Sequence, residues 1–388
     1  LHITNIKEVG KTFEIEATTT LPEGTDETKI KGNINWISVN DAVEVETRLY
    51  EDLFTLAVIK SFDGLEKHIN YNSKKVFKSF YITTAVIILI GTVIYKGDGI
   101  ESRFSNEVLG YVNVDAKRRL EGVESVVKTG KLPLVNKEDK EARPIPMLLW
   151  GDSHSRVLLP IFEKLGTDTK TNIYIAPCSS TPPLLGVCCP PKSETPEFNE
   201  AVFDFIIKNK IKVVILSARW SFYPLGDESE HAPPPLINPN NRKISAKEAF
   251  RTSYIDTIAR LRNAGVKIWV MKQVPFQDLY APTALANSIR YGRKDKFDLD
   301  RFGITEAKHK ERQSFVDDII DSHAGSGVTI LDPLPYLISS AGYCRMGKNG
   351  YSIYYDRDHL SDRGSMELYP VFSAPYHEFV DSLPAEPP

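Results

Sequence analysis

Hydrophobic and polar positions change their period several times along the chain, and each change predicts a different kind of element. Residues 12–17 alternate strictly between polar and apolar side chains, and residues 29–37 do so again, as is typical of half-buried β-strands. Residues 21–24, between these two runs, have the composition of a turn. We therefore expect a small β module over residues 1–57.

From residue 144 onward, short apolar runs alternate with longer amphipathic segments. This strand–helix repeat occurs five times, which predicts a parallel sheet covered by helices on both faces. The expected fold class is α/β, a three-layer α/β/α arrangement with a five-stranded parallel sheet over residues 144–382. We expect strands at 146–150, 172–176, 211–217, 266–272 and 327–331, and helices at 156–165, 196–209, 245–264, 304–323 and 362–382.

A third pattern is an uninterrupted apolar run at residues 79–95, which holds seventeen residues without a charge. This length is near the lower limit of roughly 17–25 residues for crossing a bilayer. Tyr81 and Tyr95 lie near its two ends, where interfacial aromatic residues belong. We expect a transmembrane helix here, with a buried core helix as the alternative. Its position deep in the chain excludes a cleaved signal peptide.

The residues that flank the apolar run predict its orientation. Lysines cluster at residues 74–78, whereas Asp98 and Glu101 follow the run. The positive-inside rule therefore places the N-terminal side in the cytoplasm and the C-terminal side across the membrane. Residues 58–78 are expected to be a linker, and residues 96–143 a helical linker with one charged helix from about Asn106 to Thr129.

Composition narrows the function classes further. The net charge of −3 gives no overall basic field, so a nucleic-acid partner is not expected. The four cysteines are not spaced as in a zinc ribbon and there is no His-Glu-x-x-His helix, so no metal site is expected. In an oxidising compartment a disulfide could form within one Pro-rich loop, or between that loop and Cys344, and the pairing stays open among Cys178, Cys188, Cys189 and Cys344.

Candidate chemistry begins at Ser153, in the turn between the first predicted strand of the sheet and the next helix. Helix N-terminal amides favour negative charge that develops beside a nucleophile. Far downstream, Asp356 precedes His359 by three residues, so both side chains can point toward one place. Each half alone is also compatible with an ordinary turn or a surface ion pair. Together they predict a triad in which Ser153 is the nucleophile, His359 the base and Asp356 the group that orients the imidazole.

Two blocks carry a resemblance to a known family: Gly151-Asp-Ser-His154 and Asp356-Arg-Asp-His-Leu-Ser361. They are similar to the first and last blocks of the SGNH hydrolase superfamily, and most similar to SGNH domains fused behind membrane-bound acyltransferase-3 proteins. The resemblance covers roughly residues 76–380. It implies an SGNH, flavodoxin-like fold and acyl transfer, chiefly acetyl transfer, to a cell-surface polysaccharide such as lipopolysaccharide, or ester hydrolysis on it.

The same resemblance implies a location and partners. An inner-membrane anchor would hold the SGNH domain on the periplasmic or extracytoplasmic side, where it would meet its glycan acceptor. No tightly held cofactor is implied. The sequence lacks the other membrane helices of the acyltransferase-3 family, so the acyl group would come from a membrane acyltransferase partner or domain. Non-catalytic presentation of a glycan is the competing hypothesis.

The middle blocks of the superfamily are poorly matched. Gly186 is the one glycine of the Pro-rich loop where the family has an oxyanion-hole glycine. The family asparagine after the third strand is missing, and Arg219 or Trp220 takes its place. These three residues are candidates for holding the oxyanion or substrate. The alternatives are a rigid Pro-rich turn for Gly186, an ion pair for Arg219 and, as the favoured role, core packing for Trp220.

The other residues of the two blocks are expected to have structural roles. His154 is expected to shape the turn after the nucleophile. Asp358 is expected to cap the following helix or to face solvent, and Ser361 is well placed as an N-cap.

The N-terminal module carries a second resemblance. Lys31-Gly-Asn-Ile-Asn-Trp-Ile-Ser38 and Arg48-Leu-Tyr-Glu-Asp-Leu-Phe54 resemble the anticodon-binding β-barrel of glutaminyl-tRNA synthetases. The ATP-binding signatures of that family are absent from this sequence, so aminoacylation is not expected. The resemblance implies either a β fragment without a function of its own or an RNA-binding piece derived from a tRNA synthetase.

Overall fold

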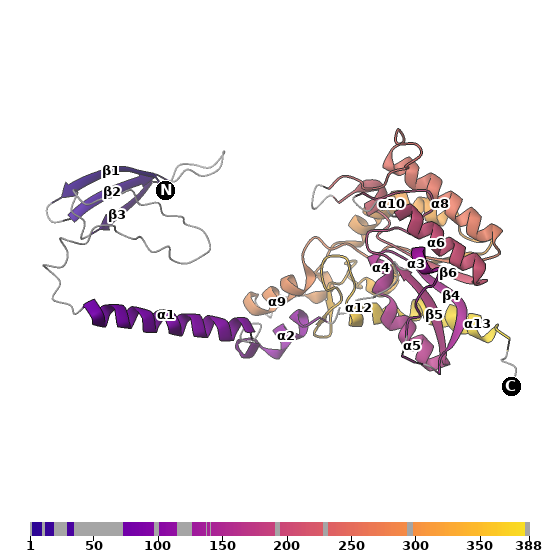
Figure 1. Cartoon of the computed structure of the whole chain (residues 1–388), viewed down its shortest axis with the longest axis horizontal. Coiled ribbons are helices and arrows are strands. Elements are labelled where there is room, and N and C mark those ends of the chain that lie inside the picture. The colour runs from indigo at the N-terminus through magenta and orange to yellow at the C-terminus, as the bar shows by residue number, and fades with distance from the viewer. Residues whose placement is uncertain are drawn as a thin grey trace. The chain divides into compact units, whose positions relative to one another are not determined.

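The structure is a computed structural model of the 388-residue chain (Figure 1). It falls into two compact units, Leu1–Ile100 and Glu101–Pro388, each of which is described by itself. The residues that the structure describes are 2–9, 12–18, 29–34, 73–96, 101–114, 126–136, 138–139, 141–190, 195–227, 232–292 and 298–384.

The first unit contains an antiparallel sheet of three strands, in the order β1 (His2–Val9), β2 (Thr12–Thr18) and β3 (Lys29–Ile34). The two alternating runs of the sequence correspond to β2 and β3. The predicted turn at 21–24 and most of the predicted linker at 58–78 lie outside the described residues.

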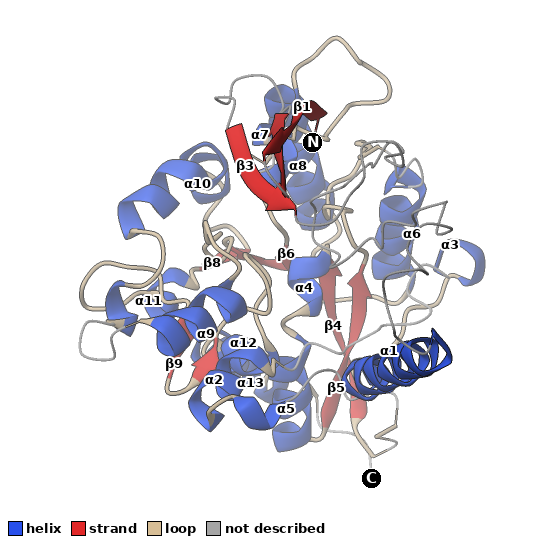
Figure 2. Ribbon diagram, turned by 90° about the vertical axis from the view of Figure 1, so that its left-hand side faces the viewer, coloured by secondary structure: helices blue, strands red, loops and turns tan. Residues whose placement is uncertain are grey.

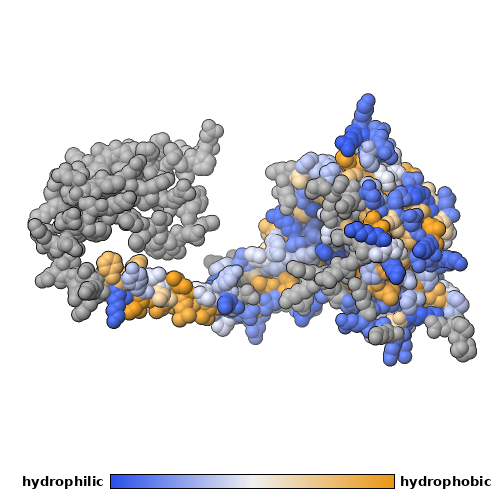
Figure 3. Space-filling view, in the orientation of Figure 1, coloured by the Kyte–Doolittle hydropathy of each residue, from blue (hydrophilic) through white to orange (hydrophobic). Residues whose placement is uncertain are grey.

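The same unit contains the long helix α1 (Ser73–Lys96). Its segment Phe77–Lys96 has a mean hydropathy of 1.9 and is long and apolar enough to cross a membrane, by length and composition only. Apolar side chains are exposed along it, as the orange surface in Figure 3 shows. Within the helix, the Thr92 hydroxyl donates to the carbonyl of Ile88 (2.7 Å), so this polar group is satisfied without solvent.

The second unit is built on five parallel strands that lie within one or two residues of the predicted ranges, apart from the earlier start of the first. Their order in the sheet is β5-β4-β6-β7-β8. This order is the flavodoxin-like one, in which the chain reverses direction across the sheet between the first and third strands, here β4 and β6. The strands are β4 (Arg143–Gly151), β5 (Thr171–Pro177), β6 (Val213–Ser217), β7 (Lys267–Met271) and β8 (Val328–Leu331).

Side chains of the sheet alternate between two apolar cores, because successive residues of a strand point to opposite faces. Leu148 and Trp150 lie in one core, and Met147 and Leu149 in the other. Helices flank the sheet in Figure 2. The first core also contains side chains of α6 (Thr195–Lys208), α8 (Ala246–Asn263) and α10 (Glu306–Asp321); the second contains those of α5 (Leu159–Thr169), α9 (Ala281–Tyr291) and α13 (Tyr369–Asp381).

Several predicted helices differ from the observed ones. The single helix expected over 106–129 is wrong, because α2 ends at Val112 and the next helix described is α3 (Val126–Thr129). The helix expected at 362–382 is divided at Leu368, the N-cap of a second helix whose first turn contains Pro370, where the missing N–H costs no intrahelical bond. The remaining helices are α2 (Asn106–Val112), α4 (Ser153–Arg156), α7 (Phe222–Leu225), α11 (Leu334–Leu337) and α12 (Asp362–Met366), and a short hairpin joins β9 (Gly347–Lys348) to β10 (Tyr351–Ser352).

The segment expected to be a linker at 96–143 largely belongs to the second unit. Val135 donates its N–H to the carbonyl of Ile173, and Ile175 donates to that of Pro133. These bonds cover the outer edge of β5 and satisfy backbone groups that an open edge strand would expose. In addition, α2 packs against α9.

The four cysteines are buried, and none of them is in a disulfide. The disulfide that the sequence left open is therefore not formed in this structure. Burial raises the pKa of the Cys344 thiol to about 12, so this thiol is a poor nucleophile at neutral pH.

Candidate active site

Ser153 is presented by a tight junction between β4 and α4. Gly151 ends the strand so close to β6 that a Cβ there would lie 1.8 Å from the Ser217 carbonyl oxygen. Asp152 is the N-cap of α4, and its Oδ1 accepts the N–H of His154 at 2.7 Å. Ser153 therefore becomes the first residue of the helix, where its own N–H has no intrahelical partner.

The structure brings the three predicted catalytic residues together. Nε2 of His359 lies 2.7 Å from Oγ of Ser153, and Nδ1 of the same ring lies 2.7 Å from Oδ2 of Asp356. This is the arrangement in which an imidazole can take the serine proton while a carboxylate fixes its tautomer. The catalytic role of the three residues stays a prediction, but their geometry is the one it requires.

The loop that carries His359 is shaped by Asp356 itself. Oδ1 of Asp356 accepts the backbone N–H groups of Asp358 (2.9 Å) and His359 (2.7 Å). One carboxylate oxygen therefore holds the backbone and the other holds the ring. Beyond the loop, Ser361 caps α12, as predicted, by accepting the N–H of Gly364.

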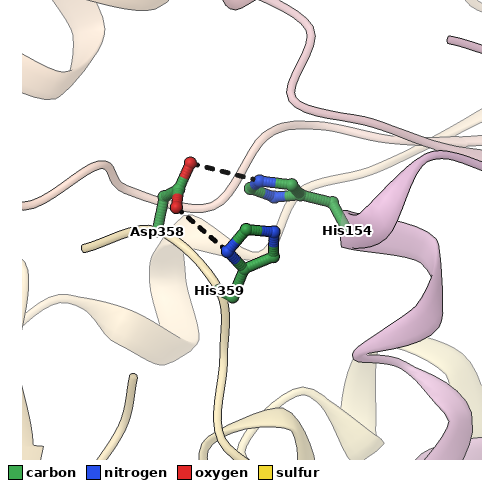
Figure 4. Close-up of side chains that lie close together, drawn as sticks. All are labelled: His154, Asp358 and His359. Carbon is green, nitrogen blue, oxygen red and sulfur yellow. Dashed lines mark ion pairs between the residues drawn. The ribbon is translucent and has the colours of Figure 1, made fainter. Parts of the chain in front are cut away.

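Asp358 does not have the position that the sequence predicted. It is 6% exposed, and it caps no helix, because Ser361 does so. Its carboxylate lies between two imidazoles, 3.2 Å from Nδ1 of His359 and 3.4 Å from Nε2 of His154, as Figure 4 shows. His154 is likewise buried, with its ring centroid 4.8 Å from that of His359, so it does more than shape the turn.

Arg219 forms ion pairs, the second of the two roles that the sequence allowed. Its Nε lies 2.7 Å from Oδ2 of Asp358, and its Nη2 lies 2.6 Å from Oδ2 of Asp227. Its backbone N–H also donates to Oδ2 of Asp152 (2.9 Å), an oxygen that accepts the Tyr223 hydroxyl as well. The loop after β6 is thereby attached both to the turn that carries Ser153 and to the loop that carries His359.

The prediction that Trp220 contacts the oxyanion or substrate is wrong. Its side chain is fully buried, its indole N–H donates to the carbonyl of Met271, and its ring packs edge-on against Phe250 and Tyr254. Core packing, the alternative role, is the observed one. It follows from the sheet, because Trp220 faces inward after β6 whereas Arg219 faces the site.

Gly186 lies at an exposed position in the Pro-rich loop, with φ of +74°. The chain beside it is attached to α8, since Leu185 accepts from Ser253 and donates its N–H to Thr257. Among the described residues, no hydrogen bond joins Gly186 to Ser153 or His359. Its role in an oxyanion site stays a prediction.

The electrostatics of the site centre on His359. Burial acts to lower the pKa of this imidazole, but the hydrogen bonds to Asp356 and Asp358 outweigh it and raise the pKa to about 10. Burial acts to raise the pKa of Asp358, but His154, His359 and Arg219 together hold it well below its ordinary value. Asp358 is therefore ionised at neutral pH, and the two carboxylates favour the charged form of the His359 imidazole.

Comparison with known proteins gives two family matches. Residues 127–374 match the SGNH domain that is fused to AT3 domains. Residues 33–89 match the anticodon-binding domain of class I tRNA synthetases for Glu and Gln, a range that begins later than predicted and runs into α1. A glutamine–tRNA ligase of Ralstonia pickettii is 45% identical over 58 residues, which are 15% of this chain and 10% of the ligase. The chain thus spans about a tenth of that curated relative.

Solved structures with similar folds have low sequence identity. The periplasmic domain of a Salmonella Paratyphi A lipopolysaccharide acetyltransferase is 13% identical, with a TM-score of 0.47 over 69% of this chain and 91% of that domain. An acylhydrolase fold from Bacteroides fragilis is 8% identical, with a TM-score of 0.37 over 69% of this chain and 99% of that one. The match at 127–374 carries the family assignment, and these likenesses add nothing to it.

Proposed function

Because this chain belongs to the family of SGNH domains that are fused to AT3 domains, we propose that it transfers an acyl group, chiefly acetyl, to a cell-surface polysaccharide through an acyl-serine intermediate. The observation that carries the proposal is the continuous path from Oγ of Ser153 through His359 to Asp356, with both contacts at 2.7 Å. Hydrolysis of an ester on the same glycan is the outcome when water replaces the sugar hydroxyl.

In the first half-reaction, Oγ of Ser153 attacks the acyl carbonyl carbon while Nε2 of His359 takes the hydroxyl proton. The N–H of Ser153, at the start of α4, is directed to the oxyanion that develops. The tetrahedral intermediate collapses, the acyl–oxygen bond to the donor breaks, and His359 returns its proton to the leaving oxygen. In the second half-reaction, His359 takes the proton of a sugar hydroxyl while its oxygen attacks the acyl carbon. The bond from the acyl carbon to Oγ then breaks, and His359 returns the proton to Oγ of Ser153.

The acceptor decides between transferase and esterase, and an acyl-partition assay distinguishes them. The purified full chain in detergent would be given p-nitrophenyl acetate with and without methyl glucoside as the sugar. We expect an acetyl group on the Ser153 peptide by mass spectrometry and acetylated sugar whose yield rises with sugar concentration. Free acetate alone would indicate an esterase. No acetylation of Ser153, with wild-type turnover no faster than the buffer blank, would contradict the proposal and favour a glycan-presenting module.

We further propose that α1 anchors the chain in the inner membrane, with residues 1–78 cytoplasmic and the SGNH domain periplasmic. The apolar, exposed surface of Phe77–Lys96 supports this placement. A membrane acyltransferase, the kind of domain to which the family is fused, would then supply the acyl group on the same side. The glycan acceptor is the second proposed partner.

The anchor can be tested by extraction of cell membranes with alkaline carbonate. Wild type is expected to stay in the membrane pellet, whereas Ile87→Lys/Ile88→Lys is expected in the soluble fraction, because each charge at a helix centre costs about 2.5–3.5 kcal/mol of insertion free energy. The matched variant Ile87→Leu/Ile88→Leu should stay in the pellet. Release of wild type by carbonate would contradict the anchor.

A further inference from the structure

We propose that Asp358 is a second acidic positioning residue for His359, held in place by Arg219 and His154. This inference rests on the proposed function, since it concerns the base of the same reaction. Its basis is the contact geometry, in which the single Nδ1 of His359 faces two carboxylates rather than one. Sequence reasoning gave Asp358 no such role.

The different contacts that the carboxylates of Asp356 and Asp358 make support the proposal. Asp356 uses Oδ1 for two backbone N–H groups and keeps only Oδ2 for the ring, at 2.7 Å. Asp358 contributes Oδ1 to the same ring nitrogen, at 3.2 Å. The N–H at Nδ1 thus has one hydrogen-bond acceptor, Oδ2 of Asp356, and a second carboxylate oxygen at ion-pair distance. A small rotation of the ring would turn this N–H toward Asp358 if Asp356 were lost.

Asp358 is also fixed on its other side. Its Oδ2 lies 2.7 Å from Nε of Arg219 and 3.4 Å from Nε2 of His154. The guanidinium is itself held between the rings of Phe222 and Phe276, each 4.7 Å from its centre, and by Asp227. A buried carboxylate without such a partner would be strongly unfavourable. Arg219, one of the two residues that stand where the family has an asparagine, therefore keeps a second negative charge beside the base.

The groups facing His359 come from its own loop, from α4 and from the loop after β6. Asp356 and Asp358 lie on its own loop, with Tyr355 stacked on the ring at 5.2 Å. Ser153 and His154 approach from α4, and Arg219, from the loop after β6, acts through Asp358. Of these, the two carboxylates favour a charged imidazole, and among the groups named Arg219 is the permanent cation that opposes it.

Binding of a metal ion is the alternative role for His154, Asp358 and His359. The ligand atoms of His154, Asp358 and His359 lie within 4.8 Å of one another. However, Oδ2 of Asp358 already contacts a guanidinium at 2.7 Å, and Nδ1 of His359 faces Asp356. A cation added between them would meet the positive charge of Arg219. These contacts favour the positioning role, and treatment with EDTA is an arm of the test.

The test is steady-state hydrolysis of p-nitrophenyl acetate by the purified full chain in detergent, over a range of pH. His359 accepts the serine proton only when neutral, so kcat/KM falls as pH falls through its pKa. Asp358→Asn removes one carboxylate and lowers the pKa of His359. The fall of kcat/KM on the acid side of the pH profile, called the acid limb, is therefore expected to move to lower pH. At alkaline pH, where His359 is neutral, kcat/KM is expected to fall about 10- to 100-fold. This is the size of effect that the loss of one hydrogen bond to a charged group produces.

Asp356→Asn sharpens the test. Loss of a sole orienting carboxylate costs about 10⁴-fold in a triad, but with Asp358 present we expect about 100-fold. The double variant should fall to the level of His359→Ala, because the two acids act as one unit. Asp358→Glu, which keeps the charge, should restore the wild-type limb, a result that a merely structural role would not give.

Asp168→Asn is the control, because it removes a carboxylate that pairs with Lys164 on α5 and contacts neither Arg219 nor the imidazole. Its acid limb is expected to stay in place. The inference is overturned if Asp358→Asn leaves the limb unmoved and Asp356→Asn already equals His359→Ala, or if EDTA abolishes turnover and Zn²⁺ restores it. If wild-type turnover does not depend on Ser153, the proposed function itself fails, which is a separate outcome.

Discussion

Replacing Ser153 by alanine is expected to lower kcat/KM for p-nitrophenyl acetate by at least about 10⁴-fold, as removal of the nucleophile does in serine hydrolases. The reason is local: Ser153 Oγ is the atom held 2.7 Å from Nε2 of His359. Without it, no acyl-serine can form, and only attack by water, aided by His359, remains. The measurement is initial-rate release of p-nitrophenolate by the purified full chain.

Ser155→Ala is the matched control for this variant. Ser155 lies on the same short helix, but its hydroxyl donates to the carbonyl of Asp152 at 2.7 Å and is fully buried. Its loss should cost about 1 kcal/mol of stability and little activity. If Ser153→Ala keeps more than about a tenth of wild-type turnover while folded, the covalent mechanism is wrong.

Replacing Gly151 by alanine is expected to destabilise the second unit by about 3 kcal/mol or more, the upper range for overpacking. The added Cβ would lie 1.8 Å from the Ser217 carbonyl oxygen and 2.9 Å from Cβ of Ser155. Because the first obstacle is the backbone of the neighbouring strand, rotation of a side chain cannot remove it. The β4–β6 pairing would have to open at the point that positions Ser153, so activity should fall together with stability.

Urea unfolding followed by tryptophan fluorescence measures this effect, because Trp150, Trp220 and Trp269 are all buried in the second unit. Gly186→Ala is the comparison: its Cβ would meet no atom within 4 Å, and the cost is that of a left-handed residue, about 1–2 kcal/mol. Equal midpoints for the two variants would show that the strand contact is less restrictive than the geometry indicates.

Much of this architecture is readable from local pattern. The five strands of the sheet are short runs of apolar residues, and such runs are buried on both faces wherever helices cover a parallel sheet. Ser153, Asp356 and His359 were identified because each lies in a local motif. The helices were less predictable at their ends and breaks, since α2 ends at Val112 and α12 ends at Met366 although the sequence pattern of each helix continues.

Local pattern could not predict the burial of Asp358. Its partners are His154, on α4 after β4, and Arg219, in the loop after β6. Nothing within Asp356-Arg-Asp-His359 distinguishes an exposed carboxylate from one closed in by groups more than a hundred residues away. The same limit explains Trp220, which was assigned to the site because it replaces an asparagine but faces the core.

The sequence by itself determined the strand–helix alternation and the apolar run of α1, and it identified Ser153, Asp356 and His359 as the candidate triad, because periodicity, length and short motifs are properties of neighbouring positions. The tertiary structure alone decided which side chains meet. The reversal of strand order between β4 and β6 places the turn that carries Ser153 beside the loop that carries Arg219. The loop that carries His359 brings two carboxylates to its imidazole. Those contacts depend on distances across the sheet, which no local pattern encodes.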